Sequence, residues 1–182
     1  MAVNGCVPPT AIVAADGATT ALLKLTDRIP DVIVSDLDGP LPDITTAVKK
    51  GSKIIIHAHA DNTELLRSSV PTFSKALGST QVKPTWNVYN FGGFTDGDRA
   101  VFMARGMHAS SIVLAGMDFG IEIGKYSKLK VRDQNVKLRK LQFGKSLLEW
   151  LAQRDGGEYY NITSAGERIA GFRRIEPDEL AS

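Results

Sequence analysis

Two aspartates stand one residue apart in the segment VSDLDGPL, residues 34–41. Asp36 and Asp38 follow the apolar run DVIVSD, so we expect their carboxylates where a buried strand passes into a loop. Two carboxylates at such a place can hold a hard cation, provide the nucleophile of an aspartate-based phosphatase, or form a polar turn. The rest of the sequence bears on which chemistry applies.

Polar side chains follow the other apolar runs as well. The expected strand ends carry Asp16 and Gly17, then Asp36 and Asp38, then His57, His59, Asp61 and Asn62, and last Asp118. Parallel strands bring their carboxyl ends to one edge of a sheet, where ligands bind. One acid after one strand is typically a helix cap, but acids after four strands would repel one another unless a cation lay between them. We therefore expect a shared Mg²⁺ and phosphate site at this edge.

The segment HAHAD places His57 and His59 on the same side of the expected third strand, because alternate residues of a strand point the same way. The spacing resembles the His-x-His metal pair of amidohydrolase-like enzymes. Such zinc sites need several more histidines, and the chain has only His108 besides these two. We expect His57 and His59 to contact phosphate or substrate. The plainer alternative is that one is buried and hydrogen-bonded while the other lines the pocket.

Two further segments could bind phosphate, although the chain lacks the Gly-x-x-x-x-Gly-Lys-Ser/Thr motif of P-loop proteins. In FGGFTDGDRA, the glycines would let the backbone approach a ligand, the threonine would cap a helix, and the arginine could bind phosphate bidentately. In GKYSK, the lysines could neutralise a transferred phosphate. Taken singly, these segments could be a strand–turn–helix connection and a solvated basic loop. The candidate residues are Gly92, Gly93, Thr95, Arg99, Lys125 and Lys128.

The sequence DLDGPL also comes close to the Asp-x-Asp-Gly-Thr motif of haloacid-dehalogenase-type phosphatases. In that interpretation Asp36 is the nucleophile and Asp38 the general acid. Three features oppose it: Pro40 replaces the threonine, a complete strand–helix unit precedes the motif, and AGMDFG supplies only Asp118 where a later acidic pair is expected.

The elements that must position these residues alternate between strands and helices along the chain. We expect strands within residues 10–16, 31–38, 52–61, 85–91 and 111–119, with late short strands in 158–163 and 171–175, and helices within 17–25, 43–51, 61–69, 95–107 and 132–154. Continuous apolar strands are typical of a sheet covered on both faces. The predicted fold class is α/β: a single three-layer domain, residues 1–182, with a mostly parallel sheet flanked by helices.

Composition sets wider bounds on the function. The 182 residues suffice for one full-sized core, and the net charge of +2 does not indicate a nucleic-acid partner. The single Cys6 excludes an internal disulfide framework and fits a reducing, cytoplasmic location. No apolar run approaches the ~20 residues that span a bilayer, so no membrane partner is expected.

Taken together, the segments AADGAT, PDVIVSDLDG, HAHADN, NFGGFTDGDRAVFMA, LAGMDFG and IGKYS resemble one family. They are similar to the archaeal 6-hydroxymethyl-7,8-dihydropterin pyrophosphokinases, the MptE-like group, which is related in fold to thiamin pyrophosphokinases. The resemblance runs from about Ala14 to Trp150. Several motifs in the same order make it far more specific than any one of them.

The resemblance implies transfer of diphosphate from ATP to the pterin hydroxymethyl oxygen, with Mg²⁺ and release of AMP, in tetrahydromethanopterin or folate-type biosynthesis. It implies catalytic roles for Asp36, Asp38, Arg99 and Lys125, and metal ligation by Asp36, Asp38, Asp61 and Asp118. ATP or pterin contacts would come from Asp16, Gly17, His57, His59, Asn62, Gly92, Gly93, Thr95 and Lys128. A homodimer is expected, and relatives carry an N-terminal extension that this chain is expected to lack. A phosphatase using Asp36, or a non-catalytic nucleotide-binding domain, stays open as an alternative.

Overall fold

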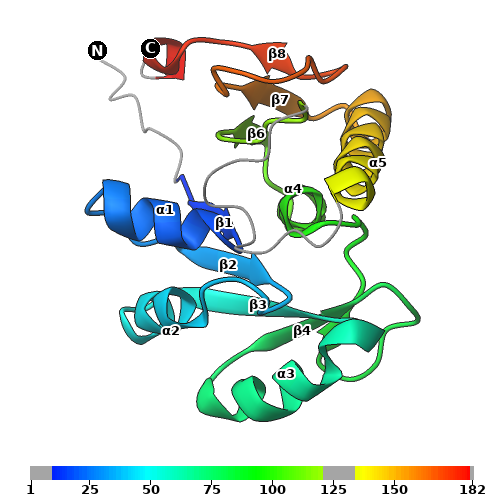
Figure 1. Ribbon diagram of the computed structural model, residues 1–182. Coiled ribbons are helices and arrows are strands. Elements are labelled where there is room, and N and C mark those ends of the chain that lie inside the picture. The colour runs from blue at the N-terminus through cyan, green and yellow to red at the C-terminus, as the bar shows by residue number, and fades with distance from the viewer. Residues whose placement is uncertain (1–9, 121–133, 181–182) are drawn as a thin grey trace, which may run out of the picture.

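The computed structural model of the protein describes residues 10–120 and 134–180, in which the strands form two separate parallel sheets (Figure 1). The larger sheet has the order β1-β2-β3-β4-β5, with β1 (Val13–Ala15), β2 (Val32–Ser35), β3 (Lys53–Ala58), β4 (Leu77–Thr80) and β5 (Val88–Tyr89). The smaller sheet has the order β6-β7-β8, with β6 (Ser111–Leu114), β7 (Glu158–Asn161) and β8 (Arg173–Arg174). The fold class is therefore α/β with parallel strands, as predicted.

Helices cover both faces of the larger sheet. One face carries α1 (Ala18–Leu25), α2 (Leu41–Lys49) and α3 (Thr63–Ser69), and the other carries α4 (Asp96–Gly106) (Figure 1). Ile33 of β2 and Ile54 of β3 pack with Ile44 of α2, whereas the next residues, Val34 and Ile55, pack toward α4. Successive residues of a strand point to opposite faces, so both faces need apolar side chains. This covering explains the continuous apolar runs in the sequence.

Helix α4 lies between the two sheets and contributes to the core of each. Ala100 and Met103 pack against the larger sheet. Val101 joins Ile112 of β6 and Leu148 of α5 (Gln134–Arg154) in the core of the smaller sheet. Because α4 is held from both sides, its N-terminus has a fixed position relative to the carboxyl ends of β1 and β2.

Two expectations about the strands are wrong. The fourth strand of the larger sheet is β4, which the sequence analysis did not predict, and the expected strand in residues 85–91 is reduced to β5. The small side chains of β4 hide its strand pattern, yet the sheet needs them, since a Cβ at Gly78 would come within 2.9 Å of a methyl carbon of Val88. The second wrong expectation is that all the strands form one sheet. Strand β6 pairs with β7 and so belongs to the smaller sheet.

The expected helices are all present in the described part of the chain. Gly51, with a φ of 118°, follows the end of α2, and Thr95 is the N-cap of α4, as the sequence predicted. The helix preceding α3 is a short 3-10 turn, η1 (Ala60–Asn62), for which His59 is the N-cap. Among the described helices, none combines the length and the apolar character needed to cross a membrane.

Candidate active site

The loop after β1 presents the buried carboxylate of Asp16. Its backbone has a φ of 41°, and its N–H donates to the carbonyl of Val34 at 2.9 Å. Ser35 Oγ, also buried, donates to Asp16 Oδ1 at 2.6 Å. The chain of the next loop passes so near that a Cβ at Gly39 would lie 2.3 Å from Asp16 Oδ2. These contacts fix both the place and the direction of the Asp16 side chain.

The loop after β2 presents the second buried carboxylate, that of Asp36. Leu37, with a φ of 69°, turns the chain, and its N–H donates to Ser35 Oγ at 2.8 Å. Asp36 Oδ1 accepts the backbone N–H of Asp38 at 3.2 Å, and Asp36 Oδ2 lies 3.3 Å from His59 Nε2. Ser35 therefore links the two loops, because its hydroxyl contacts both Asp16 and the turn after Asp36.

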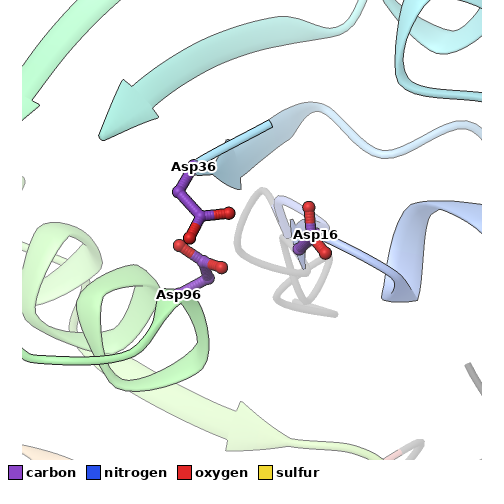
Figure 2. A group of neighbouring side chains, drawn as sticks. All are labelled: Asp16, Asp36 and Asp96. Carbon is purple, nitrogen blue, oxygen red and sulfur yellow. The ribbon is translucent and has the colours of Figure 1, made fainter. Parts of the chain in front are cut away.

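Asp96, the first residue of α4, completes a group of three carboxylates (Figure 2). One oxygen of each of Asp16, Asp36 and Asp96 lies within 4.8 Å of the others. Burial raises the pKa of Asp96 well above its usual value, and the carboxylates of Asp36 and Asp16 raise it further. Arg99 acts in the opposite direction on this pKa. A bound cation would offset the repulsion among the three carboxylates.

The chemistry and spacing of this group fit a divalent cation such as Mg²⁺, which binds hard carboxylate oxygens and takes further ligands from phosphates. In residues 10–120 and 134–180, no other three aspartate, glutamate, histidine or cysteine side chains bring ligand atoms within 4.8 Å of one another. Asp38, Asp61 and Asp118, which we expected as ligands beside Asp36, do not belong to it.

Each of these three aspartates has a different place in the structure. The backbone N–H of Asp38 donates to Asp36, and the backbone N–H of Asp61 donates to His59 Nδ1 at 3.3 Å. Asp118 follows β6, a strand of the smaller sheet, which explains why its carboxylate does not join those at the edge of the larger one. Asp118 Oδ1 is buried without a hydrogen-bond partner in the described part of the chain.

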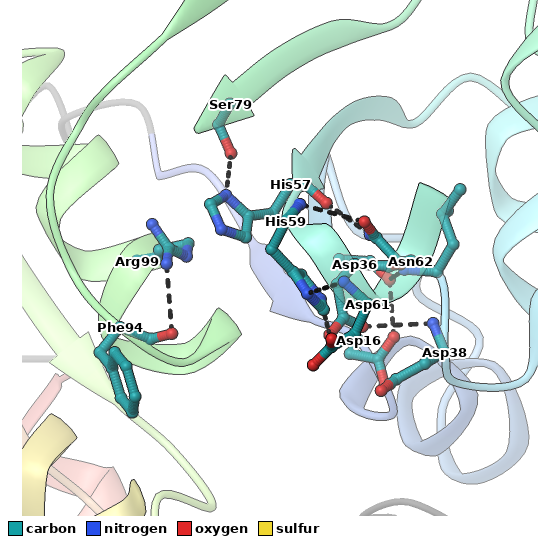
Figure 3. A network of polar contacts seen from close by, with 12 residues as sticks. Asp16, Asp36, Asp38, His57, His59, Asp61, Asn62, Ser79, Phe94 and Arg99 are labelled. Carbon is teal, nitrogen blue, oxygen red and sulfur yellow. Dashed lines mark hydrogen bonds and ion pairs between the residues drawn. The ribbon is translucent and has the colours of Figure 1, made fainter. Parts of the chain in front are cut away.

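The two histidines at the end of β3 differ in environment (Figure 3). His57 is buried, and its Nδ1 lies 3.0 Å from Ser79 Oγ on the neighbouring strand β4. Burial lowers the pKa of His57 to about 4, with smaller contributions from Arg99 and His59, so the ring is neutral at pH 7. His59 is half-buried beside Asp36. The arrangement matches the plainer alternative, in which one histidine is buried and bonded and the other lines the site.

Asn62 joins the loops after β2 and β3. Its side-chain amide donates to the carbonyls of Asp36 at 2.9 Å and His57 at 2.8 Å, while its Oδ1 accepts the N–H of His59 at 3.0 Å. All these bonds go to backbone groups, and the side chain is buried. The structure thus gives Asn62 a role in loop geometry; a contact with ATP or pterin stays a prediction.

The segment before α4 is compact and makes many internal contacts. Gly92 and Gly93 have φ values of 90° and 80°, and a Cβ at Gly93 would lie 2.7 Å from the Arg99 backbone. The buried Arg99 guanidinium donates to the carbonyl of Gly92 at 3.3 Å. It also donates to the carbonyl of Phe94 at 3.2 Å (Figure 3). Asp98 accepts the N–H of Thr95 at 2.9 Å and completes a capping box. These contacts explain the sequence pattern as a rigid entry into α4, which fixes Asp96.

Asp96 is the site residue that the sequence analysis did not single out. Its signal was present, because an acid in the first turn of a helix after a glycine-rich loop stands where a ligand could bind. Such an acid is also favourable for the helix dipole alone, so its type and place in the sequence do not by themselves indicate a ligand. The candidates Lys125 and Lys128 lie outside the described residues.

Comparisons with known proteins agree with the motifs. A family model described as "6-hydroxymethylpterin diphosphokinase MptE-like" matches residues 6–124. Three archaeal proteins named 6-hydroxymethyl-7,8-dihydropterin pyrophosphokinase are similar to this chain. The protein of Methanothermobacter thermautotrophicus is 45% identical over 153 residues, which cover 81% of this chain and 65% of the relative. That of Methanocaldococcus jannaschii is 44% identical, covering 77% and 62%. That of Pyrococcus furiosus is 49% identical, covering 76% and 61%.

The chain therefore spans 65%, 62% and 61% of the lengths of these three relatives. The match of the family model includes the strand ends and the N-terminus of α4, and hence Asp16, Asp36 and Asp96. On the family model and on these identities, the chain belongs to the MptE-like 6-hydroxymethylpterin diphosphokinase family.

Proposed function

We propose that this chain catalyses transfer of diphosphate from ATP to 6-hydroxymethyl-7,8-dihydropterin, giving AMP and the pterin diphosphate, with Mg²⁺. The acceptor is taken from the names of the relatives. The observation that carries the proposal is the group formed by Asp16, Asp36 and Asp96 at the carboxyl edge of the larger sheet. This edge is where open α/β sheets bind ligands.

In the proposed reaction the pterin hydroxymethyl oxygen attacks the β-phosphorus of ATP. The bond between that phosphorus and the oxygen bridging to the α-phosphate breaks, and AMP leaves with the bridging oxygen. The hydroxymethyl proton passes to solvent or to a nearby base. Such transfer needs positioning and charge stabilisation rather than a covalent enzyme intermediate, so no nucleophilic side chain is required.

The three carboxylates would hold Mg²⁺, which neutralises charge on the transferred phosphates when it is bound. Without a cation, this acidic group would repel a triphosphate, since like charges a few ångströms apart are unfavourable. The proposal therefore requires strict dependence on a divalent cation. The rigid segment carrying Gly92, Gly93 and Thr95 would place Asp96 for this purpose.

Several finer roles stay predictions of the same proposal. Arg99, Lys125 and Lys128 would balance charge on the phosphates, and His57, His59 and Gly17 would line the pocket. A homodimer and a place in tetrahydromethanopterin or folate-type biosynthesis also stay predictions. For Arg99, any contact with phosphate has to be made by a guanidinium that already donates to two loop carbonyls.

The experiment is to incubate the protein with ATP, Mg²⁺ and reduced hydroxymethylpterin and to measure AMP. AMP that forms only with pterin and metal, and that is lost in Asp36→Asn, supports the proposal. Phosphate release from small phosphomonoesters, abolished by Asp36→Asn and without pterin-dependent AMP, would instead identify an aspartate-nucleophile phosphatase. Binding of ATP and Mg²⁺ without AMP for any hydroxymethyl acceptor would identify a non-catalytic domain.

A further inference from the structure

His59 contacts Asp36 through a ring whose hydrogen position is fixed by the backbone. His59 Nδ1 lies 3.3 Å from the backbone nitrogen of Asp61, and His59 Nε2 lies 3.3 Å from Asp36 Oδ2. A backbone N–H can only donate, so Nδ1 must be the accepting nitrogen. The hydrogen of the neutral ring is then on Nε2, where it points to the carboxylate of Asp36.

The orientation of this ring is itself held by its surroundings. The backbone N–H of His59 donates to Asn62 Oδ1 at 3.0 Å, and Asn62 in turn donates to the carbonyl of Asp36 at 2.9 Å. The ring stacks on that of His57, with centroids 5.9 Å apart and planes 28° apart (Figure 3). His59 is thus tied to the same loop that carries Asp36, so the two side chains keep their relative positions.

Both oxygens of Asp36 receive a donor from the protein. Oδ1 accepts the N–H of Asp38 at 3.2 Å, and Oδ2 faces the Nε2–H of His59. Two donors on opposite oxygens restrict rotation of the carboxylate about its last torsion. The restricted carboxylate is the one that lies beside Asp96 in the group of three (Figure 2).

We propose that His59 is a positioning residue that orients Asp36 for cation binding, rather than a direct contact to phosphate or pterin. The inference rests on the proposed function, because it takes the three aspartates as the cation site. Partners that donate to a ligating carboxylate fix its direction, and their loss commonly weakens metal affinity by about 10- to 100-fold.

His59 is also the N-cap of η1, so the test must separate the two roles. In His59→Asn, the short side chain places an acceptor near the former Nδ1 and keeps a good cap, but it cannot reach Asp36. In His59→Gln, the longer side chain can bring an amide donor to the former place of Nε2, but it is a poor cap. The two variants therefore remove one role each.

The readout is Mn²⁺ binding to the full chain, followed by the electron paramagnetic resonance of free Mn²⁺, together with thermal unfolding. We expect His59→Asn to weaken Mn²⁺ binding about 10-fold with little change in Tm, and His59→Gln to bind within about 3-fold of wild type. Equal Mn²⁺ binding by His59→Asn and wild type would overturn the inference. If the KM of His59→Asn for pterin rises while its Mn²⁺ binding stays equal, His59 contacts the substrate instead, and the inference is overturned in the same way. Weakening by His59→Gln but not by His59→Asn, in step with a loss of Tm, would assign a capping role and overturn the inference as well. If the wild type itself binds no Mn²⁺, the cation site of the proposed function fails, and that result is distinct from the others.

Discussion

The two ends of helix α4 (Asp96–Gly106) lie beside aspartates in opposite electrostatic situations. At the N-terminus, Asp96 faces the carboxylates of Asp16 and Asp36, and burial with these neighbours raises its pKa. At the C-terminus, Arg105 Nε contacts Asp155 Oδ2 at 2.5 Å, and Tyr159 donates to the same oxygen at 2.5 Å. Burial alone would raise the pKa of Asp155, but hydrogen bonds from Tyr159, Gly157 and Arg105 lower it.

The difference separates a group built for a ligand from one built for the fold. Asp155 has its charge balanced by protein groups, and its partners join α4, α5 and β7. The N-terminal group gathers like charges, which costs stability unless something positive binds there. A carboxyl group such as that of Asp96, whose pKa is raised by burial and by neighbouring like charges, is typical of a functional site.

The largest expected effect comes from Asp96→Asn. The variant removes one proposed ligand, so pterin-dependent AMP formation should fall by about 10²- to 10³-fold. Its stability should be equal or higher, since repulsion among the carboxylates is relieved. Steady-state AMP assays and Tm measurements check both parts. A variant that keeps full activity would place the cation elsewhere.

The matched change at the other end of the helix is Asp155→Asn. Asp155 is both the ion-pair partner of Arg105 and the hydrogen-bond acceptor for Tyr159. Because the substitution weakens both contacts, we expect a loss of about 1–2 kcal/mol in the free energy of unfolding. Activity of the folded variant should stay near that of wild type. Urea unfolding and the same AMP assay provide the measurement. A variant Asp155→Asn that is as stable as wild type but inactive would contradict the purely structural role given to Asp155.

Ser35→Ala sharpens the comparison at the N-terminal end. Ser35 Oγ donates to Asp16 Oδ1 at 2.6 Å, so the variant should weaken Mn²⁺ binding by about 3- to 10-fold, less than a lost ligand would. The control is Ser52→Ala, whose buried hydroxyl donates to the Pro30 carbonyl at 2.6 Å at the opposite edge of the sheet. It should affect Tm but not Mn²⁺ binding. Equal Mn²⁺ affinities for both variants would contradict the role given to Ser35.

The smallest expected effect is a pH dependence from His57. Its pKa is about 4 in the folded protein, against 6.5 as the ordinary value, with burial as the main cause. Between these values the unfolded chain binds a proton that the folded chain does not, so stability falls as pH decreases through this window. Urea unfolding at pH 7 and pH 5 measures the change, and His57→Gln should reduce it. A ring that titrates near pH 6.5 by NMR would show the burial argument to be wrong.

Much of the fold and part of the site could be predicted from the sequence. Strand periodicity located the loops after β1, β2 and β3, and with them Asp16, Asp36 and the two histidines. Strand partners are not contained in such a pattern, so Asp118 was grouped with a sheet to which its strand does not belong. Strand β4 was not predicted because Gly78 and Ser79 lack the apolar side chains that indicate a strand. Gly78 leaves room for Val88, and the hydroxyl of Ser79 contacts His57.

Asp96 could not be identified from local sequence because its role depends on tertiary placement. The position of α4 is set by Ala100 and Met103 against one sheet and by Val101 against the other. Only this packing brings the helix start to the carboxylates of β1 and β2. For the same reason, spacing along the chain favoured Asp38, which is nearer to Asp36 in sequence but offers it a backbone N–H.

The most direct test of the cation site is a crystal structure of the wild-type chain grown with Mn²⁺ and a non-hydrolysable ATP analogue, with the metal located by its anomalous scattering. The account predicts a Mn²⁺ peak within about 2.0–2.3 Å of carboxylate oxygens of Asp16, Asp36 and Asp96, as for a hard cation on oxygen ligands. A peak held instead by Asp38, Asp61 or Asp118, with the three-aspartate group empty, would contradict it.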